Sequence, residues 1–246
     1  MEVIMNVGFL YIIYKNFDKE QDELLFFNEA LCSIKSLRSF TKLPIYIKTD
    51  YPNFFEHQGI ENLFIEAFTR TPDLEYRTHQ KLLSLKDLPF GLTFFVDSDT
   101  LFLSNPEVLI SRDFDLQICR EVCWKAYQKE KSPTLLRGFN SGFFIAKNTN
   151  KYHSLIAKAI DILQNPQSYS RLFDIPHFQG DQWYLNQALL RVFDLDIKIL
   201  QPHWNIRPPL FSLINTALKN PKLLHARGGE LTEGIKLIKS NLFVDS

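Results

Sequence analysis

The chain has 246 residues, of which 45% are hydrophobic and 23% are charged. This length and balance fit one sizeable folded α/β core and argue against an intrinsically disordered chain. Its 28 basic and 28 acidic residues give a formal net charge of zero. The chain therefore lacks the basic footprint of a nonspecific nucleic-acid binder.

The N-terminal segment, Met1 to Tyr14, is apolar but lacks a basic leader and a small-residue cleavage site. We interpret it as a first strand rather than a signal peptide. No apolar run approaches the roughly 20 residues that span a bilayer, so we expect no transmembrane segment. Three cysteines, Cys32, Cys119 and Cys123, fit the reduced thiols of a cytosol-like compartment, and we expect a cytoplasmic protein.

Hydrophobic periodicity predicts strands alternating with helices along the chain. The predicted strands are 7–14, 44–48, 63–68, 92–96, 114–119, 139–146, 197–200 and 221–225, and the predicted helices are 19–40, 71–88, 152–163 and 181–192, with a short turn or helix beginning at 104–106. Segment 120–137 shows no clean period and is either a mobile segment over the site or a poorly patterned connection. The alternation predicts βαβ units, a mostly parallel sheet and a single domain spanning 1–246.

The stretch 92–103 holds the first candidate site, because an apolar run meets two carboxylates, Asp97 and Asp99, before another apolar run follows. Side chains at i and i+2 of an extended chain point the same way, about 6.6 Å apart. The pair can therefore face one cation at the carboxyl edge of the sheet, where open α/β sheets bind ligands. Two hard oxygen ligands suit Mg²⁺ or Mn²⁺ better than zinc. The alternative is a solvated turn with two surface aspartates.

Further along the chain, other motifs follow the acid pair in a characteristic order. They are Phe95-Val96-Asp97-Ser98-Asp99, then Phe139-Asn140-Ser141-Gly142-Phe143, then Gly180-Asp181-Gln182-Trp183-Tyr184-Leu185-Asn186, then Leu224-His225, with Thr78-His79-Gln80-Lys81-Leu82 upstream. From about residue 7 to 229, the chain resembles the retaining GT-A glycosyltransferases of the family-8 type and related nucleotide-diphospho-sugar transferases. The resemblance implies a GT-A (Rossmann-like) domain with a mostly parallel mixed sheet flanked by helices.

The same resemblance implies a metal-dependent transfer of a sugar from a UDP-sugar donor to an unknown acceptor, which could be a glycan, a protein or a small molecule. Retention of anomeric configuration is implied as well. The implied metal is Mn²⁺, or Mg²⁺, and imidazole beside carboxylates favours Mn²⁺. The implied ligands of the metal are Asp97, Asp99 and His225, with Asp97 also touching the ribose.

The implied donor contacts come from elements far apart in the sequence. They are Tyr14 and Lys15 at the uracil base, Lys81 at the donor, Asn140 at the donor sugar, and Asp181 and Gln182 near the reacting carbon. Asp181 is the candidate nucleophile or electrostatic stabiliser, and the amide oxygen of Gln182 could serve instead. The sequence does not decide between Asp181 and Gln182 for this role.

One departure from the family follows His225. The family usually continues Gly-x-x-Lys-Pro-Trp, with the lysine on the diphosphate, whereas this chain continues Ala226-Arg227-Gly228-Gly229-Glu230. Arg227 could supply the missing charge, although an arginine fork is not a lysine point charge. The departure leaves a non-catalytic nucleotide-binding or glycan-binding GT-A-like module as an alternative.

A haloacid-dehalogenase-like phosphatase is a second alternative, because those enzymes also place an Asp-x-Asp pair at a strand end. The phosphatase motif has Thr or Val two residues after the second acid, where this chain has Leu101. The individual motifs also have structural readings. His225 could be a hydrogen-bonded core histidine, Gly142 a strand kink, and Asp181 a helix N-terminal charge.

Overall fold

We describe a computed structural model of the chain. The structure describes residues 6–15, 24–69, 77–122, 135–169, 180–213, 220–226, 230 and 232–236. Among the helices in these ranges, none has both the length and the hydropathy that crossing a bilayer requires.

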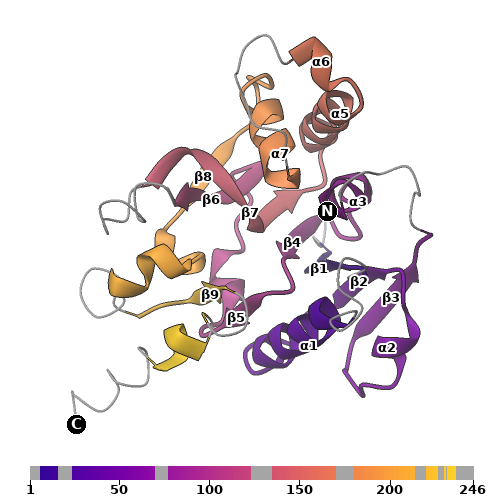
Figure 1. Cartoon of the computed structure of the whole chain (residues 1–246), viewed down its shortest axis with the longest axis vertical. Helices are drawn as coiled ribbons and strands as arrows, with labels where there is room; N and C mark the ends of the chain where they lie inside the picture. Colours follow the sequence, from indigo (N-terminus) through magenta and orange to yellow (C-terminus); the bar gives the residue numbers. More distant parts are fainter. Residues whose placement is uncertain are drawn as a thin grey trace, which may run out of the picture.

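In the described ranges, seven strands form the main sheet in the order β3-β2-β1-β4-β7-β6-β8 (Figure 1). The strands are β1 (Val7–Ile13), β2 (Ile45–Thr49), β3 (Leu63–Ala67), β4 (Leu92–Val96), β6 (Leu116–Val122), β7 (Leu135–Lys147) and β8 (Ile197–Leu200). β3, β2, β1 and β4 run parallel, β7 is antiparallel to both β4 and β6, and β8 is parallel to β6. This confirms the predicted mostly parallel, mixed sheet.

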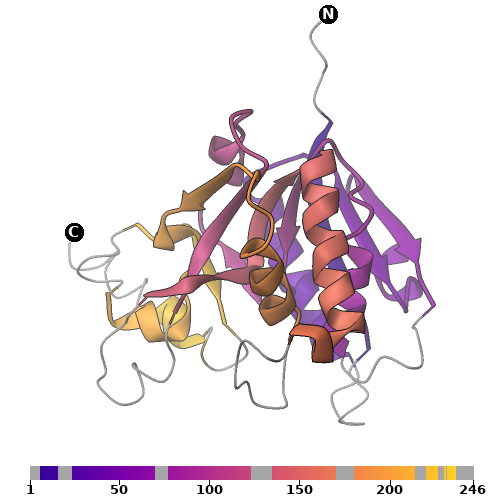
Figure 2. The same cartoon turned by 90° about the horizontal axis from the view of Figure 1, so that it is seen from above.

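The strand side chains alternate between two hydrophobic clusters, one on each face of the sheet. In β1, Phe9 and Tyr11 belong to the cluster covered by α1 (Leu25–Arg38), whereas Leu10 belongs to the opposite cluster. Three helices contribute to the opposite cluster: α3 (Arg77–Ser84), α5 (Asn150–Gln164) and α7 (Asp181–Leu189). Figures 1 and 2 show α1 on one side of the sheet and α5 and α7 on the other. Burial on both faces explains the continuous apolar run of β4.

Two short strands, β5 (Thr100–Phe102) and β9 (Leu223–His225), form a separate antiparallel sheet beside the carboxyl end of β4. Ile206 makes a parallel bridge to Leu224, and both side chains belong to a third hydrophobic cluster. The remaining short helical elements are α2 (Asn53–Glu56), α6 (Pro166–Tyr169), η2 (Pro106–Leu109), η4 (Pro202–Trp204) and η5 (Pro208–Leu213). The small sheet matters for function because it carries the C-terminal part of the chain back to the acid pair.

Most predicted elements are confirmed, with shifts at their ends. The bounds of β8 and the start of α7 at Asp181 are as predicted, and η2 begins where the turn or helix was expected. The prediction of 120–137 as a connection was wrong at both ends, because residues 120–122 continue β6 and residues 135–137 begin β7. Hydrogen bonding across the pair, rather than local periodicity, holds these ends in the sheet. Residues 16–23, 70–76 and 123–134, which include the predicted helix starts at 19 and 71 and Cys123, lie outside the described residues.

Candidate active site

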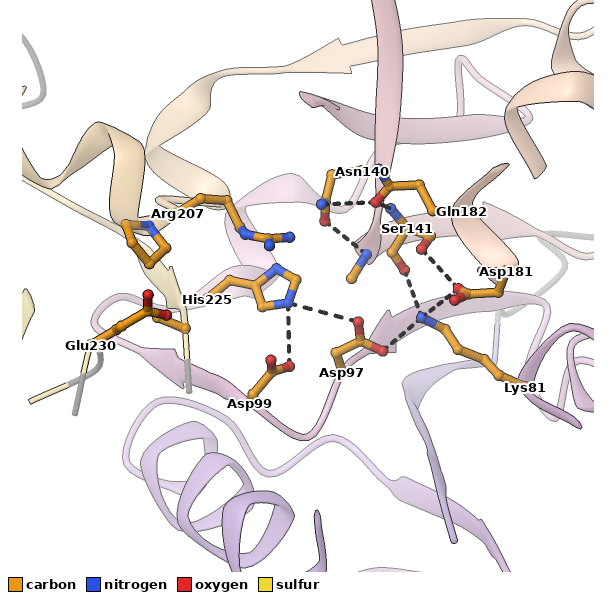
Figure 3. A pocket seen from close by; sticks show the side chains of 13 residues that line it. Lys81, Asp97, Asp99, Asn140, Ser141, Asp181, Gln182, Arg207, His225 and Glu230 are labelled. Carbon is orange, nitrogen blue, oxygen red and sulfur yellow. Dashed lines mark hydrogen bonds and ion pairs between the residues drawn. The ribbon is translucent and has the colours of Figure 1, made fainter. Parts of the chain in front are cut away.

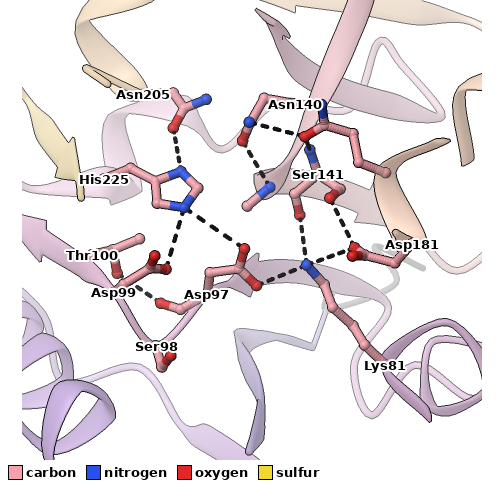
Figure 4. Close-up of polar contacts among 12 residues, drawn as sticks. Lys81, Asp97, Ser98, Asp99, Thr100, Asn140, Ser141, Asp181, Asn205 and His225 are labelled. Atoms are coloured by element: carbon pink, nitrogen blue, oxygen red, sulfur yellow. Dashed lines mark hydrogen bonds and ion pairs between the residues drawn. The ribbon is translucent and has the colours of Figure 1, made fainter. Parts of the chain in front are cut away.

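The acid pair sits where β4 ends, as predicted, but Ser98 and Asp99 form a turn rather than an extended strand. The Asp97 backbone N–H donates to the Gly142 carbonyl on β7 (2.8 Å), and the Thr100 hydroxyl donates to the Asp97 carbonyl (2.9 Å). These two bonds fix the turn from both sides. Both carboxylates consequently point toward the same space (Figure 4).

His225 reaches the acid pair because β5 and β9 pair with Thr100 directly opposite His225. The Ala226 N–H also donates to the Asp99 carbonyl (2.9 Å). The His225 Nε2 atom lies 3.2 Å from Asp99 Oδ1 and 3.8 Å from Asp97 Oδ2. The three predicted metal ligands therefore converge from two sheets, with one ligand atom of each lying within 4.8 Å of the other two.

These distances fit a divalent cation. Two ligands that are each about 2.1 Å from one ion lie about 3 Å apart at right angles and about 4.2 Å apart when opposite. The separations of 3.2 and 3.8 Å from His225 Nε2 fall inside that range. Two carboxylates and one imidazole are also side chains that bind divalent cations in proteins. Asp97, Asp99 and His225 are thus a candidate metal site.

Gly142 makes room for the His225 imidazole, a role that the sequence analysis missed. A Cβ at position 142 would lie 1.9 Å from His225 Cε1, 2.6 Å from Nδ1 and 2.8 Å from Nε2. Ordinary van der Waals contact begins at 3.4 Å. Position 142 must therefore be glycine for the ring to keep this place. The β6–β7 register is also irregular across the Asn-Ser-Gly motif, between the pairs Ile118–Phe144 and Arg120–Phe139, as the strand-kink interpretation predicts.

Lys81 lies between two carboxylates, and its Nζ atom is 2.8 Å from both Asp97 Oδ1 and Asp181 Oδ2 (Figure 3). Burial alone would lower the pKa of Lys81, but the charges of Asp181 and Asp97 outweigh it and raise that pKa above its ordinary value. For Asp97, burial raises the pKa, Lys81 opposes that shift, and the charge of Asp99 adds to it. Lys81 is therefore a charged bridge between the acid pair and the N-terminus of α7.

Asn140 and Gln182, two of the predicted donor contacts, are hydrogen-bonded to each other. Asn140 Nδ2 donates to Gln182 Oε1 (3.0 Å), and the Ser141 N–H donates to the same oxygen (3.3 Å). Glu121, which the sequence analysis did not single out, accepts from Asn140 Nδ2 (2.7 Å) and from Gln182 Nε2 (2.5 Å). Asp181 joins this cluster through the Ser141 hydroxyl (2.8 Å). Glu121 had no sequence signal because it lies within the segment that showed no pattern.

Two cavities meet at these residues. The larger, of about 280 Å³, is lined by the metal candidates, Lys81, the amide cluster and Arg207, whose guanidinium points into it (Figure 3). The smaller, of about 140 Å³, shares Lys81 and the acid pair and continues to Tyr14 and Phe26. Both cavities are therefore lined by the acid pair and by Lys81 and Asp181.

The remaining predicted site residues divide into two cases. Lys15, which follows β1 together with Tyr14, turns its N–H to the carboxylate of Asp50 (3.1 and 3.2 Å) and its Nζ over the ring of Tyr51 (4.3 Å). It is thus placed away from the cavity that Tyr14 lines. Arg227 lies outside the described residues.

No protein-family model matches the chain, and no curated protein sequence matches it. Solved structures do match. Glycosyltransferase GlyE from Streptococcus pneumoniae TIGR4 has a TM-score of 0.59 and 14% identity over 92% of this chain, which spans 55% of the length of GlyE. The apo form of mouse xyloside xylosyltransferase 1 has a TM-score of 0.55 and 14% identity, covering 91% of this chain and 97% of that one.

The galactosyltransferase LgtC, solved in complex with donor and acceptor sugar analogues, has a TM-score of 0.59 and 12% identity, covering 95% of both chains. At these identities the likeness establishes the fold, which is that of the GT-A glycosyltransferases. The phosphatase alternative is wrong for this reason, since a haloacid-dehalogenase domain is a different fold.

Proposed function

We propose that this GT-A domain, spanning residues 1–246, is a metal-dependent glycosyltransferase that moves a sugar from a UDP-sugar donor to an acceptor. The single observation that carries the proposal is the convergence of Asp97, Asp99 and His225 at the meeting point of two cavities. A nucleoside diphosphate sugar has the matching layout, with a planar base at one end, a charged diphosphate in the middle and a sugar at the other end.

Each part of such a donor has complementary residues. The smaller cavity offers Tyr14 and Phe26, whose rings meet edge to face with centroids 6.0 Å apart, as a wall for a planar base. The larger cavity offers hydrogen-bonding groups to sugar hydroxyls, from Asn140, Asp181 and Gln182. We assign the nucleoside to the first cavity and the sugar to the second.

A bound Mn²⁺ or Mg²⁺ would stabilise the negative charge that builds on the diphosphate leaving group. Lys81 and Arg207 add positive charge to the same cavity, and Lys81 pairs with both Asp97 and Asp181. Asp181 then presents a carboxylate to the sugar. It either stabilises positive charge at the reacting carbon, or attacks that carbon and displaces UDP, after which the acceptor displaces Asp181 and the two inversions give net retention. Gln182 is the alternative for that role; its amide oxygen accepts from Asn140 and Ser141, just as Asp181 Oδ2 accepts from Ser141 and pairs with Lys81.

A thermal-shift experiment with UDP tests the donor assignment. UDP should raise the melting temperature only when Mn²⁺ is present, and more than other nucleoside diphosphates do. The shift should disappear in Asp99→Ala and weaken in His225→Ala, whereas Asp113→Ala, which removes an exposed acid elsewhere, should keep it. An unchanged shift in Asp99→Ala would refute the metal assignment.

A turnover assay distinguishes an enzyme from a non-catalytic binding module. The module is the alternative function because the family's Lys-Pro-Trp segment is missing after His225. A panel of UDP-sugars is incubated with the protein and Mn²⁺, and released UDP is measured. We expect release from at least one donor, and Asp181→Asn should abolish it while donor binding is kept. UDP binding without release from any donor, with or without added acceptors, would favour the module.

A further inference from the structure

Asn205 holds the His225 imidazole on the side opposite the acid pair. Its side-chain oxygen, Oδ1, lies 2.8 Å from His225 Nδ1, and both side chains are buried, with 2% and 4% of their surface exposed (Figure 4). The two ring nitrogens thus have different neighbours. Nδ1 faces an amide oxygen, and Nε2 faces the two carboxylates.

The chemistry of imidazole gives this contact a consequence. A neutral imidazole has one N–H and one lone pair, and the hydrogen bond made by one nitrogen decides which nitrogen carries the proton. An amide oxygen can only accept, so it holds the proton on Nδ1. The lone pair is then on Nε2, the nitrogen directed at Asp97 and Asp99. We infer that Asn205 is a positioning residue that sets the His225 tautomer needed for metal ligation, an inference that rests on the proposed metal-dependent function.

The backbone fixes this pair independently of the two side chains. Ile206, the residue after Asn205, accepts a hydrogen bond from the His225 N–H (3.0 Å) and donates its own N–H to the Leu223 carbonyl (2.9 Å). The Asn205 N–H donates to the Pro202 carbonyl (3.0 Å), which ends η4. Because β9 and the Asn205 segment are tied one residue away on each side, the 2.8 Å contact does not depend on a mobile loop.

The ring also lies close to β7 on a third side. The Cε1 edge of His225 lies against Gly142, where a Cβ would be only 1.9 Å from Cε1. The contribution that we assign to Asn205 is the position of the proton on this closely packed ring.

The buried amide nitrogen of Asn205 supports a role for its oxygen. Within the part of the chain that the structure describes, Asn205 Nδ2 is buried without a hydrogen-bond partner. A buried donor without a partner costs free energy, and a leucine of similar size would avoid that cost. An amide is the worse choice for packing alone, which points to the acceptor oxygen as the reason for asparagine here.

Mn²⁺ binding to the nucleotide-free protein tests the inference, with free Mn²⁺ measured by electron paramagnetic resonance. Asn205→Leu should weaken Mn²⁺ binding by about 10–100-fold, the range found for outer partners of metal-ligating histidines. Asn205→Asp should restore binding to the wild-type level or tighter, because a carboxylate also accepts from Nδ1–H. Asn148→Leu is the matched control, since it removes an exposed asparagine whose Oδ1 lies 2.7 Å from His153 Nε2, and it should leave Mn²⁺ affinity unchanged.

A spectroscopic readout separates positioning from folding. In the Mg²⁺-loaded protein, which is diamagnetic, the His225 Nδ1 proton should give a slowly exchanging NMR signal in wild type and in Asn205→Asp, and no such signal in Asn205→Leu. Wild-type Mn²⁺ affinity in a folded Asn205→Leu variant, or failure of Asn205→Asp to restore a lost affinity, would overturn the inference. Absence of Mn²⁺ binding in the wild-type protein would instead overturn the proposed metal-dependent function, and the role of Asn205 with it.

Discussion

Substituting Gly142 is the sharpest test of the site's geometry, because one methyl group should displace one metal ligand. The added Cβ of Gly142→Ala would sit 1.9 Å from His225 Cε1, against an ordinary contact of 3.4 Å. The difference, 3.4 − 1.9, means that the ring must retreat by about 1.5 Å. Metal–ligand distances tolerate shifts of only about 0.2 Å, so His225 should no longer reach the ion.

We expect Mn²⁺ affinity to fall in Gly142→Ala by more than the roughly 10–100-fold that follows loss of an outer partner. Isothermal titration calorimetry of the nucleotide-free protein measures this affinity. Gly138→Ala is the matched control on the same strand, because the atom nearest to its Cβ would be in the Asn186 side chain, at 3.2 Å, and Mn²⁺ binding should persist.

The same clash should lower the stability of the Gly142→Ala variant, and a double variant keeps the test decisive. Removing the ring in Gly142→Ala/His225→Ala relieves the clash, so the double variant should melt at a higher temperature than Gly142→Ala alone. A folded Gly142→Ala protein with wild-type Mn²⁺ affinity would refute the reasoning. A double variant no more stable than the single one would also contradict it.

Three further predictions concern buried groups. Lys81→Met leaves the carboxylate of Asp181 buried without its counter-charge, which should lower the free energy of unfolding in urea by about 3–5 kcal/mol. The double variant Lys81→Met/Asp181→Asn should recover part of that loss. Equal stability of the single and double variants would contradict the ion pair. Ser33→Ala removes a buried hydroxyl whose Oγ lies 3.0 Å from the Tyr11 hydroxyl, and it should lower the free energy of unfolding by about 1–3 kcal/mol. A loss below about 0.5 kcal/mol would argue against this hydrogen bond. Burial raises the pKa of the Cys119 thiol, so Cys119 should stay unreactive toward a disulfide reagent in the native protein, whereas the exposed Cys32 should react. Single-cysteine variants separate the two rates, and fast labelling of Cys119 would contradict its burial.

The sequence predicted those features of the fold that depend on neighbouring residues. The apolar run of β4 and the alternation of strands with helices are local patterns, and they led to the mostly parallel sheet. The predictions failed where structure depends on partners distant in sequence, as at the ends of β6 and β7, which the ladder between them extends. Glu121 lies on one of those extensions, so its contact with Gln182 could not be predicted from any local pattern.

The sequence alone predicted the acid pair at the end of a buried strand, because a short apolar run rich in β-branched and aromatic residues is typical of a strand buried on both faces. Family resemblance, rather than spacing, led to His225 as the third ligand. Only the tertiary structure decided that the imidazole meets the carboxylates, through the pairing of β9 with β5 that sets Thr100 opposite His225. Only the structure showed that Gly142 and Asn205 lie next to the His225 imidazole. The physical reason is that strand register and side-chain contacts depend on residues far apart in the chain, and the local preferences of each residue do not specify these long-range pairings.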